Sequence, residues 1–327
     1  MRRSFHRACV CLLALGFVLL VGCSSSSPPK APKAVKTVDF IPNSSTPFWK
    51  VARKGCEKAD SELADVNVKF KSVYGGTKEE QNRFIREAFE RDDADAIAIS
   101  PVDSAAQKQV LNDAAKKAVL ITQDSDAPDT DRVLYIGADN RAAGRQAGEL
   151  MKKALPQGGK IMVFVGKREV QNAQERFDGL KEALQGSKVE IIDLLTDDTD
   201  PSRARDNAYQ TLKIHPDVAG MVGLWSYNGP AIVNALRPEN MLGKIKIVCF
   251  DDERETLEGI RTGAIYGTVA QQPFEYGYQA VQAAAKILRG DRSVIPADKR
   301  ILIPTTVITR ENVVDYTEKL NKLIGSQ

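Results

Sequence analysis

The sequence predicts an α/β fold with parallel sheets, divided between two lobes of similar size. Short apolar runs rich in β-branched residues alternate with helical segments, and each strand–helix pair occupies roughly 25–30 residues. This alternation is typical of βαβ units, whose parallel strands are buried on both faces. About ten such strands in a chain of 327 residues would make one unusually wide open sheet. Two lobes are therefore favoured, and their first boundary is expected at Ile136–Asn140.

The expected elements follow in order, each strand being a short apolar run bounded by turn residues and each helix a segment with apolar residues at helical spacing. The expected strands are Val38–Ile41, Val66–Val73, Ala96–Ser100, Val119–Thr122, Val133–Ile136, Lys160–Val165, Val189–Leu195, Gly220–Leu224, Ile245–Phe250, Ile265–Ala270 and Ile301–Ile308. The expected helices are Pro47–Leu63, Thr77–Arg91, Asp103–Lys117, Asn140–Ala154, Glu169–Leu184, Pro201–Ile214, Pro230–Arg237, Glu253–Thr262, Phe274–Arg289 and Glu311–Leu323.

The stretch from Val38 to Lys54 combines a strand, a turn and the start of a helix. Its first residues alternate like a strand, and its middle reads N-S-S-T-P-F-W, with turn and cap residues before two adjacent aromatics. Pro47 suits the first turn of the helix, because its missing N–H would be unpaired there. Phe48 and Trp49 would then lie at the carboxyl end of the first strand, where open α/β sheets bind ligands.

The composition is that of an ordinary globular protein, with 43% hydrophobic and 6% aromatic residues. The formal net charge of +3 comes from three arginines ahead of Cys23, so the chain from Cys23 onward carries 43 basic and 43 acidic residues. A neutral chain gives no reason to propose nucleic-acid binding. Cys56 and Cys249 are expected to be buried free thiols.

Residues 1–23 are expected to be a lipoprotein signal peptide. A basic segment precedes an apolar run from Ala8 to Val21, which is too short for a convincing transmembrane helix. The run ends in L-V-G-C, which resembles the bacterial lipobox, so Cys23 is the expected lipid-attachment residue. A simple signal peptide and a structural cysteine are the alternatives. Residues 24–35 are expected to be a flexible linker, and the protein is expected on the periplasmic or cell-surface face of a bacterial membrane.

Groups that catalyse reactions or bind metals are scarce in the sequence. The histidines are His6, within the expected signal peptide, and His215, in a predicted turn, and no zinc, phosphate-binding or nucleophile-elbow motif is present. The aspartates of 124–131 and 197–200 suggest calcium loops at first sight, but the glycine and terminal glutamate of an EF-hand are missing. The sequence therefore predicts a protein that is not an enzyme and has neither metal nor cofactor.

Polar side chains gather instead at the ends of predicted strands. They are Ser100, Asp124, Asp251 and Gln271, and Arg176 lies in the helix after a strand. Asp, Arg and Gln side chains can each make two directed hydrogen bonds, which fits the vicinal hydroxyl groups of a sugar. The aromatic faces of Phe48, Trp49 and Trp225 fit the apolar C–H face of a sugar ring. Such a site can be selective without catalysis, because each buried hydroxyl group must find a partner.

Eight short segments stand in a particular order along the chain. They are S-S-T-P-F-W, A-I-A-I-S-P-V-D, V-L-I-T-Q-D-S, Y-I-G-A-D-N, A-Q-E-R-F-D-G, H-P-D-V, V-C-F-D and T-V-A-Q-Q-P. This order resembles the periplasmic ribose-binding protein family, the sugar-binding subunits of ABC importers, from Val38 to about Pro304. The resemblance implies two Rossmann-like lobes, joined by three hinge crossovers, that enclose a monosaccharide. It implies an N-terminal lobe of residues 36–138 plus 272–300 and a C-terminal lobe of residues 139–271 plus 301–327.

The resemblance also implies roles for single residues. Phe48 and Trp49 match the aromatic pair that sandwiches the sugar, and Asp124 and Asp251 match acids that follow two of the strands. Arg176 matches the guanidinium of the second lobe, and Gln271 matches the hinge amide. Departures from the family pattern are Thr46 in place of an Asn, Ser100 after the third strand, Ser125 in place of an Arg, Thr199 in place of an aromatic residue and Trp225 in place of an Asn. Trp225 is expected to take over the stacking role lost at Thr199. The retained residues imply ribose or a related pentose or hexose as the ligand.

The expected function is that of a lipid-anchored, monomeric receptor that hands a monosaccharide to an ABC permease and its ATPase subunit. The alternative is a receptor of the same fold that passes a sugar or autoinducer-type signal to a sensor kinase or chemoreceptor. Structural roles stay open for some of the candidates: helix N-caps for Asp124 and Asp251, a surface ion pair for Arg176, and core packing for Phe48 or Trp49. Asn140 is expected to be a hinge or cap residue rather than a ligand contact.

Overall fold

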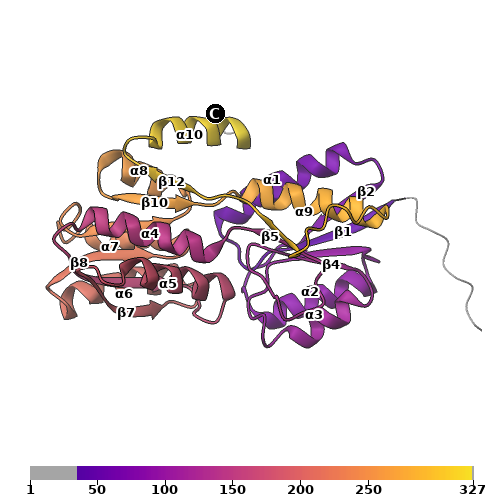
Figure 1. Cartoon of the computed structure of the whole chain (residues 1–327), viewed down its shortest axis with the longest axis horizontal. Helices are drawn as coiled ribbons and strands as arrows, with labels where there is room; N and C mark the ends of the chain where they lie inside the picture. Colours follow the sequence, from indigo (N-terminus) through magenta and orange to yellow (C-terminus); the bar gives the residue numbers. More distant parts are fainter. Residues whose placement is uncertain (1–34, 326–327) are drawn as a thin grey trace, which may run out of the picture. The chain divides into compact units, whose positions relative to one another are not determined.

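The computed structural model describes residues 35–325, which belong to one compact unit of the chain. Within these residues, two sheets of six strands each form two lobes, and helices cover both faces of each sheet (Figure 1). The prediction of an α/β fold with two lobes is therefore confirmed.

The sheet of the first lobe consists of parallel strands only. Its strands are β1 (Lys36–Ile41), β2 (Val66–Phe70), β3 (Ala96–Ile99), β4 (Val119–Gln123), β5 (Leu134–Gly137) and β11 (Arg300–Leu302), in the order β11-β5-β4-β3-β1-β2. Its helices are α1 (Pro47–Glu62), α2 (Lys78–Glu90), α3 (Lys108–Ala115) and α9 (Pro273–Leu288).

The sheet of the second lobe is parallel except for its last strand, which pairs antiparallel with its neighbour. Its strands are β6 (Gly159–Val165), β7 (Val189–Thr196), β8 (Val218–Gly223), β9 (Lys246–Phe250), β10 (Gly267–Ala270) and β12 (Thr306–Thr309), in the order β12-β10-β9-β8-β6-β7. Its helices are α4 (Asn140–Ala154), α5 (Gln171–Leu184), α6 (Pro201–Ile214), α7 (Asn228–Leu236), α8 (Arg254–Thr262) and α10 (Val313–Ile324).

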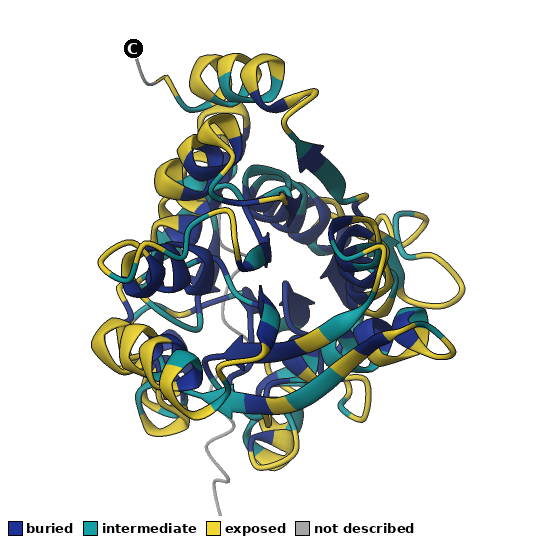
Figure 2. Cartoon of the chain, turned by 90° about the vertical axis from the view of Figure 1, so that its left-hand side faces the viewer, coloured by how far each residue is buried: buried dark blue, intermediate teal, exposed yellow. Residues whose placement is uncertain are grey.

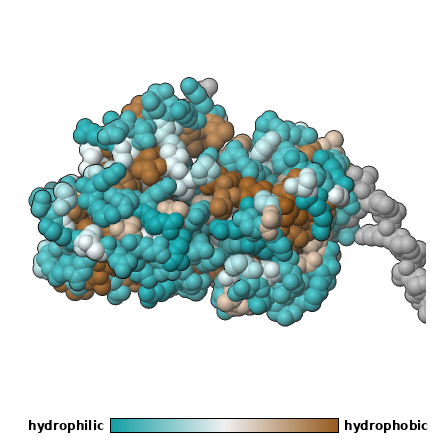
Figure 3. Space-filling view, viewed as in Figure 1, coloured by the Kyte–Doolittle hydropathy of each residue, from teal (hydrophilic) through white to brown (hydrophobic). Residues whose placement is uncertain are grey.

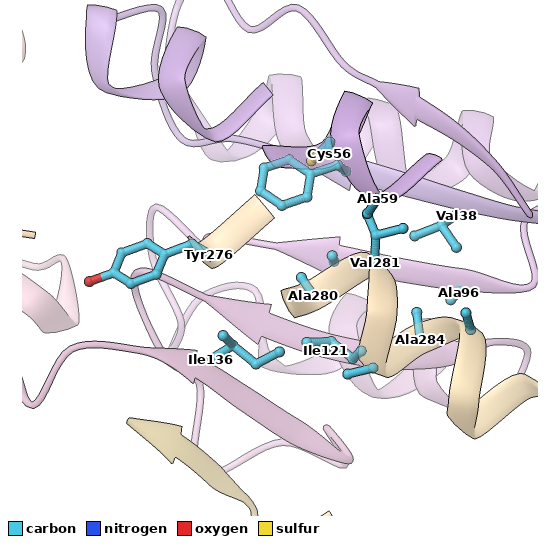
Figure 4. Close-up of a cluster of buried hydrophobic side chains, with 14 of the residues drawn as sticks. Val38, Cys56, Ala59, Ala96, Ile121, Ile136, Tyr276, Ala280, Val281 and Ala284 are labelled. Atoms are coloured by element: carbon cyan, nitrogen blue, oxygen red, sulfur yellow. The ribbon is translucent and has the colours of Figure 1, made fainter. Parts of the chain in front are cut away.

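Each sheet is buried on both faces by apolar clusters. In β3, Ala96 and Ala98 belong to the cluster under α1 and α9, whereas Ile97 and Ile99 belong to the cluster on the opposite face. Figure 4 shows the first of these clusters, and Figure 2 shows buried strands enclosed by helices with exposed outer faces. This double burial explains the continuous apolar runs of the sequence. The surface is mainly hydrophilic, with hydrophobic residues gathered over α1 and α9 in the view of Figure 3.

The chain passes three times between the lobes, as the resemblance implied. The crossings join β5 to α4, β10 to α9 and β11 to β12. Hydrogen bonds connect the third crossing to the other two: Ile303 N donates to Gly137 O in the first crossing (2.8 Å), and Gln272 Nε2 in the second crossing donates to Pro304 O (2.7 Å).

Three predicted elements differ from the structure by more than two residues. The expected strand Ile301–Ile308 is two strands, because β11 pairs with β5 in the first lobe and β12 pairs with β10 in the second. The third crossing therefore falls at Ile303–Thr305, later than expected. The helix expected from Asp103 begins only at Lys108, because the Asp103 side chain accepts a hydrogen bond from Ala106 N (2.9 Å) and stabilises a turn. The strand that starts at Val66 ends at Phe70.

Both cysteines of the described part of the chain, Cys56 and Cys249, are buried free thiols, as expected. Among residues 35–325, none of the helices combines the length and the apolar character needed to cross a bilayer. The expected signal peptide, its Cys23 and residues 24–34 of the expected linker lie outside the described residues.

Candidate ligand-binding site

A cavity lies where strands from both sheets end, and with the solvent space at its opening it encloses about 330 Å³. Its walls come from the segments after β1, β4, β8, β9 and β10 and from α5. Eight of the nine ligand-binding residues predicted from the sequence line it: Thr46, Phe48, Trp49, Asp124, Arg176, Trp225, Asp251 and Gln271. This is the edge at which open α/β sheets bind ligands.

Ser100 is the predicted residue that does not line the cavity. It is fully buried directly after β3, and its Oγ donates a hydrogen bond to Asp124 Oδ2 (2.8 Å). Asn43 Nδ2 donates to the same carboxylate oxygen (3.3 Å) and to Ser100 Oγ (3.0 Å). Ser100 therefore positions Asp124 instead of facing the cavity.

Asp124 and Asp251 occupy equivalent places in the two lobes. Each follows the third strand in the order of its sheet, and each has a positive φ, of 60° and 66°. Their backbone N–H groups donate to the neighbouring strand, at Ile136 O (3.1 Å) and Val269 O (3.0 Å). Non-glycine residues in this left-handed conformation are uncommon and cluster at binding sites. Neither residue is a helix N-cap, so that alternative is wrong.

Burial raises the pKa of both carboxyl groups. The pKa of Asp124 rises to about 6, because desolvation outweighs the attraction of the Arg176 guanidinium and the hydrogen bond from Ser100. The pKa of Asp251 is raised by the same desolvation, against the effects of Arg176 and of the hydrogen bonds from Gln271. The cavity thus contains one buried cation and two buried carboxyl groups, which accept hydrogen bonds when ionised.

Arg176 is 1% exposed and is held by the second lobe. Its Nε donates a hydrogen bond to Asn140 Oδ1 (2.9 Å) and its Nη1 donates one to Leu224 O (2.8 Å). Its Nη2 is buried with no hydrogen-bond partner among residues 35–325, which leaves a charged donor for a ligand. The alternative of a surface ion pair is therefore wrong. Asn140 supports Arg176, whereas Asp139 caps α4 through its hydrogen bond from Ala142 N.

Phe48 and Trp49 are partly core residues and partly cavity wall. Their ring centroids lie 5.0 Å apart in an edge-on arrangement, and Trp49 Nε1 donates to both Asn43 Oδ1 and Ser44 Oγ (3.0 Å each). The Phe48 ring also contacts Tyr276, at 6.2 Å between centroids. Figure 4 shows the Tyr276 hydroxyl group turned out of the core, and this group donates to Gln271 Oε1 (3.2 Å).

Trp225 and Tyr227 form the aromatic wall of the second lobe. Their ring centroids lie 6.4 Å apart in an edge-on arrangement. Gly166 allows this packing, because a Cβ at this position would come within 2.0 Å of Trp225 Cζ3. The Tyr227 hydroxyl group donates to Asp197, which also accepts from Asn228 Nδ2 (3.1 Å). Asp197 thus positions an aromatic ring, and no cluster of three or more possible metal ligands occurs in the part of the chain that the structure describes.

Five lining residues were not predicted from the sequence: Asn43, Ser44, Asn172, Ser226 and Tyr227. Four of them lie within six residues of the predicted aromatic residues Phe48, Trp49 and Trp225. Including the neighbours of those aromatic residues in the predicted site would have found these four. Asn172 lies four residues before Arg176, and residues at that spacing share one face of a helix. This spacing is the signal that could have found it.

The fold and the cavity together define a two-lobed α/β receptor for a small polar molecule. The chain belongs to the periplasmic binding protein domain family, which matches residues 40–292. This membership agrees with the family that the eight segments indicated.

Individual relatives agree with this membership. The chain is 24% identical over 315 residues to the D-ribose/D-allose-binding protein of Pseudomonas aeruginosa, with 90% of this chain and 97% of that protein covered. An ABC transporter solute-binding protein from Burkholderia graminis, solved in complex with D-arabinose, matches with a TM-score of 0.82 and 29% identity over 87% of this chain and 99% of that one. The solved XylFII–LytSN complex matches with a TM-score of 0.78 and 26% identity over 85% of this chain and 98% of that one.

Proposed function

We propose that the protein is the solute-binding lipoprotein of an ABC-type sugar importer, which binds a monosaccharide between its lobes and delivers it to the permease. The observation that carries this proposal is the lining of the cavity, where carboxylates, a guanidinium and aromatic rings converge from both lobes. A sugar needs this combination, because its hydroxyl groups must be paired when buried and its C–H face packs well on aromatic rings. The proposal includes no catalytic step.

The proposed ligand is ribose or a related pentose or hexose. Three charged groups keep hydrogen-bonding capacity for it: Arg176 Nη2, Asp124 Oδ1 and Asp251 Oδ2, none of which has a hydrogen-bond partner among residues 35–325. These groups offer one donor and two acceptors, which suits a small neutral polyol. The similarity to a D-ribose/D-allose-binding protein and to a structure that holds D-arabinose supports a monosaccharide of this size.

Closure of the lobes is the proposed mechanism. In this mechanism the two predicted lobes move relative to each other as rigid bodies. Residues 301 and 302 belong to the first lobe rather than the second, because β11 pairs with β5. Away from the crossings, two hydrogen bonds link the lobes: Asn172 Nδ2 donates to Asp124 Oδ2 (3.1 Å) and Lys167 Nζ donates to Gly76 O (2.8 Å). A ligand that contacts both lobes favours the closed state, and the permease would recognise that state.

The proposed location is the periplasmic or cell-surface face of a bacterial membrane, with a lipid on Cys23 and residues 24–35 as the tether. Family membership supports an extracytoplasmic place for the binding domain. We propose that the receptor is a monomer and that the permease with its ATPase subunit is its protein partner.

A thermal-shift screen of the chain from Ser24 onward tests the proposal. Pentoses, hexoses, polyols and nucleosides are the probes, and a true ligand at about 100 times its Kd stabilises the folded state by about 2.7 kcal/mol. A clear rise in Tm with one monosaccharide is the expected result, and Trp225→Ala should reduce that rise. No shift with any sugar would overturn the assignment to sugar import.

A signal receptor is the second candidate function, because XylFII, which is similar to this chain, was solved in a complex with another protein, LytSN. A strain that lacks this protein separates the two functions. Loss of uptake of the identified sugar supports import. Normal uptake together with loss of the transcriptional response to that sugar supports a receptor that acts through a sensor kinase or chemoreceptor.

A further inference from the structure

Asn172 lies in the cavity wall between the lobes and was not among the residues predicted from the sequence. It is the second residue of α5, is 3% exposed and lies one helical turn before Arg176. The two side chains therefore extend from the same face of α5 toward the same cavity. Arg176 is held entirely by its own lobe, whereas Asn172 reaches the other lobe.

The orientation of the Asn172 amide is fixed by its two partners. Its Oδ1 accepts a hydrogen bond from Trp225 Nε1 (3.1 Å), and its Nδ2 donates one to Asp124 Oδ2 (3.1 Å). An indole N–H can only donate and a carboxylate can only accept, so the reverse orientation of the amide would break both bonds. Asn172 thus connects an aromatic residue of the second lobe to an acid of the first.

This connection occupies one half of the Asp124 carboxylate. Oδ2 accepts from Ser100 Oγ, Asn43 Nδ2 and Asn172 Nδ2, whereas Oδ1 accepts no hydrogen bond within residues 35–325. A carboxylate oxygen has about two lone-pair directions, so three donors leave no room on Oδ2 for a ligand hydroxyl group. Asp124 can therefore bond the ligand only through Oδ1, and it cannot form the contact in which each of its two oxygens accepts from one of two vicinal hydroxyl groups.

The same connection removes the polar group of Trp225 from the cavity. Its indole N–H is already donated to Asn172, so the side chain offers a ligand only its ring. Gly166 lies directly against this ring and keeps it in place. A ligand oxygen directed at this wall would be buried without a donor, which disfavours binding.

We propose that Asn172 is a specificity-determining residue: it completes the set of donors that closes Asp124 Oδ2 to the ligand, and it leaves only an apolar ring face at Trp225. This inference rests on the proposed function, because it concerns which sugar the cavity accepts. A binding site rejects analogues strongly when they leave buried polar groups unpaired, so the restriction acts on the configuration of single carbon atoms.

The test measures the Kd of eight sugars by isothermal titration calorimetry for the native chain and for Asn172→Ala. The sugars are D-ribose, D-arabinose, D-xylose, D-lyxose, D-allose, D-glucose, D-mannose and D-galactose, and each is an epimer of at least one other sugar in its series. The variant removes one of the three donors to Asp124 Oδ2 and frees Trp225 Nε1. The expected result is that the ratio of Kd values between the preferred sugar and one of its epimers falls by about tenfold or more. Gln174→Ala is the matched control, because Gln174 is exposed on the same helix and does not line the cavity.

The other outcomes separate this inference from the proposed function. If the variant weakens binding of every sugar by the same factor, Asn172 only links the lobes, and the inference is overturned. Unchanged Kd values overturn it as well. If the native chain binds none of the eight sugars, both the inference and the monosaccharide assignment fail. Asn172→Ser, which keeps a small polar group but cannot reach both partners, replaces the alanine variant if that variant does not fold.

Discussion

Replacement of Arg176 by methionine should destabilise the protein by an amount that depends on pH. Methionine keeps an unbranched apolar side chain but removes the guanidinium that donates to Asn140 and Leu224. It also removes the positive charge that favours the ionised forms of Asp124 and Asp251. Loss of one member of a buried charged group costs about 3–5 kcal/mol of unfolding free energy, because the remaining charges are left uncompensated.

The pH dependence follows from the pKa of Asp124. This pKa is about 6 in the folded protein against an ordinary value of 3.8, so the folded state binds more protons than the unfolded state between these values. The stability that comes from this extra proton is complete below 3.8 and is lost as the pH rises through 6. Without Arg176 the folded-state pKa rises further, so stability continues to fall above 6. The difference between variant and native chain should therefore widen from about pH 5 to about pH 8.

Urea unfolding followed by circular dichroism at several pH values measures this difference. Lys181→Met is the control, because it removes an exposed cation of the same helix, which forms an ion pair with Asp178 and a cation–π contact with Phe177. Exposed pairs of this kind contribute little, so the control should unfold like the native chain at each pH. A constant loss across the pH range would refute the argument that Arg176 compensates the buried acids, and so would no loss at all.

Three further outcomes concern the supports of the cavity. Gly144→Ala should lower the Tm by a few degrees in a thermal scan, because its Cβ would lie 2.1 Å from Arg176 O. An unchanged Tm would show that α4 and α5 can move apart at little cost in free energy. Gly166→Ala should shift the tryptophan fluorescence and weaken sugar binding, since its Cβ would displace Trp225, and native spectra with native Kd values would contradict this. Sugar affinity should fall as the pH decreases through about 6, because protonated Asp124 loses its charge. Calorimetry at several pH values measures this change. A constant Kd would argue against a role of this carboxylate in binding.

The fold was predictable because parallel strands buried on both faces leave a strong pattern. Continuous apolar runs such as Ile97–Ile99 and Ile247–Phe250 have no other simple interpretation when helical segments alternate with them. The stretch Ile301–Ile308 was misread as one strand, although Pro304 lies inside it and cannot donate to a sheet. That proline was a signal for the break. The assignment of β11 and β12 to different sheets depends on tertiary pairing, which local sequence does not contain.

Site residues were predictable from the sequence where they directly follow a strand. Asp124, Asp251 and Gln271 follow strands, and parallel strands bring their carboxyl ends to one edge of a sheet. Ser100 also follows a strand, but Asn43 and Asp124 draw its hydroxyl group into a buried network. The spacing of Asn172 from Arg176 could have placed it at the cavity, but its hydrogen bond to Asp124 in the other lobe depends on tertiary structure that no local pattern contains.

The two lobes present the same acidic group in the same local setting, although their sequences show no exact repeat. Tyr135 OH donates to Asp124 O (3.0 Å), and Thr268 Oγ1 donates to Asp251 O (2.8 Å). In both lobes, the residue that follows this donor accepts the backbone N–H of the aspartate through its carbonyl oxygen. A pair of equivalent acids can bind the hydroxyl groups that many sugars share. The groups without an equivalent in the other lobe, Arg176 and Asn172 on α5, break this symmetry. We therefore expect α5 to contribute to discrimination between similar sugars, which is why Asn172→Ala should change the choice of ligand rather than abolish binding.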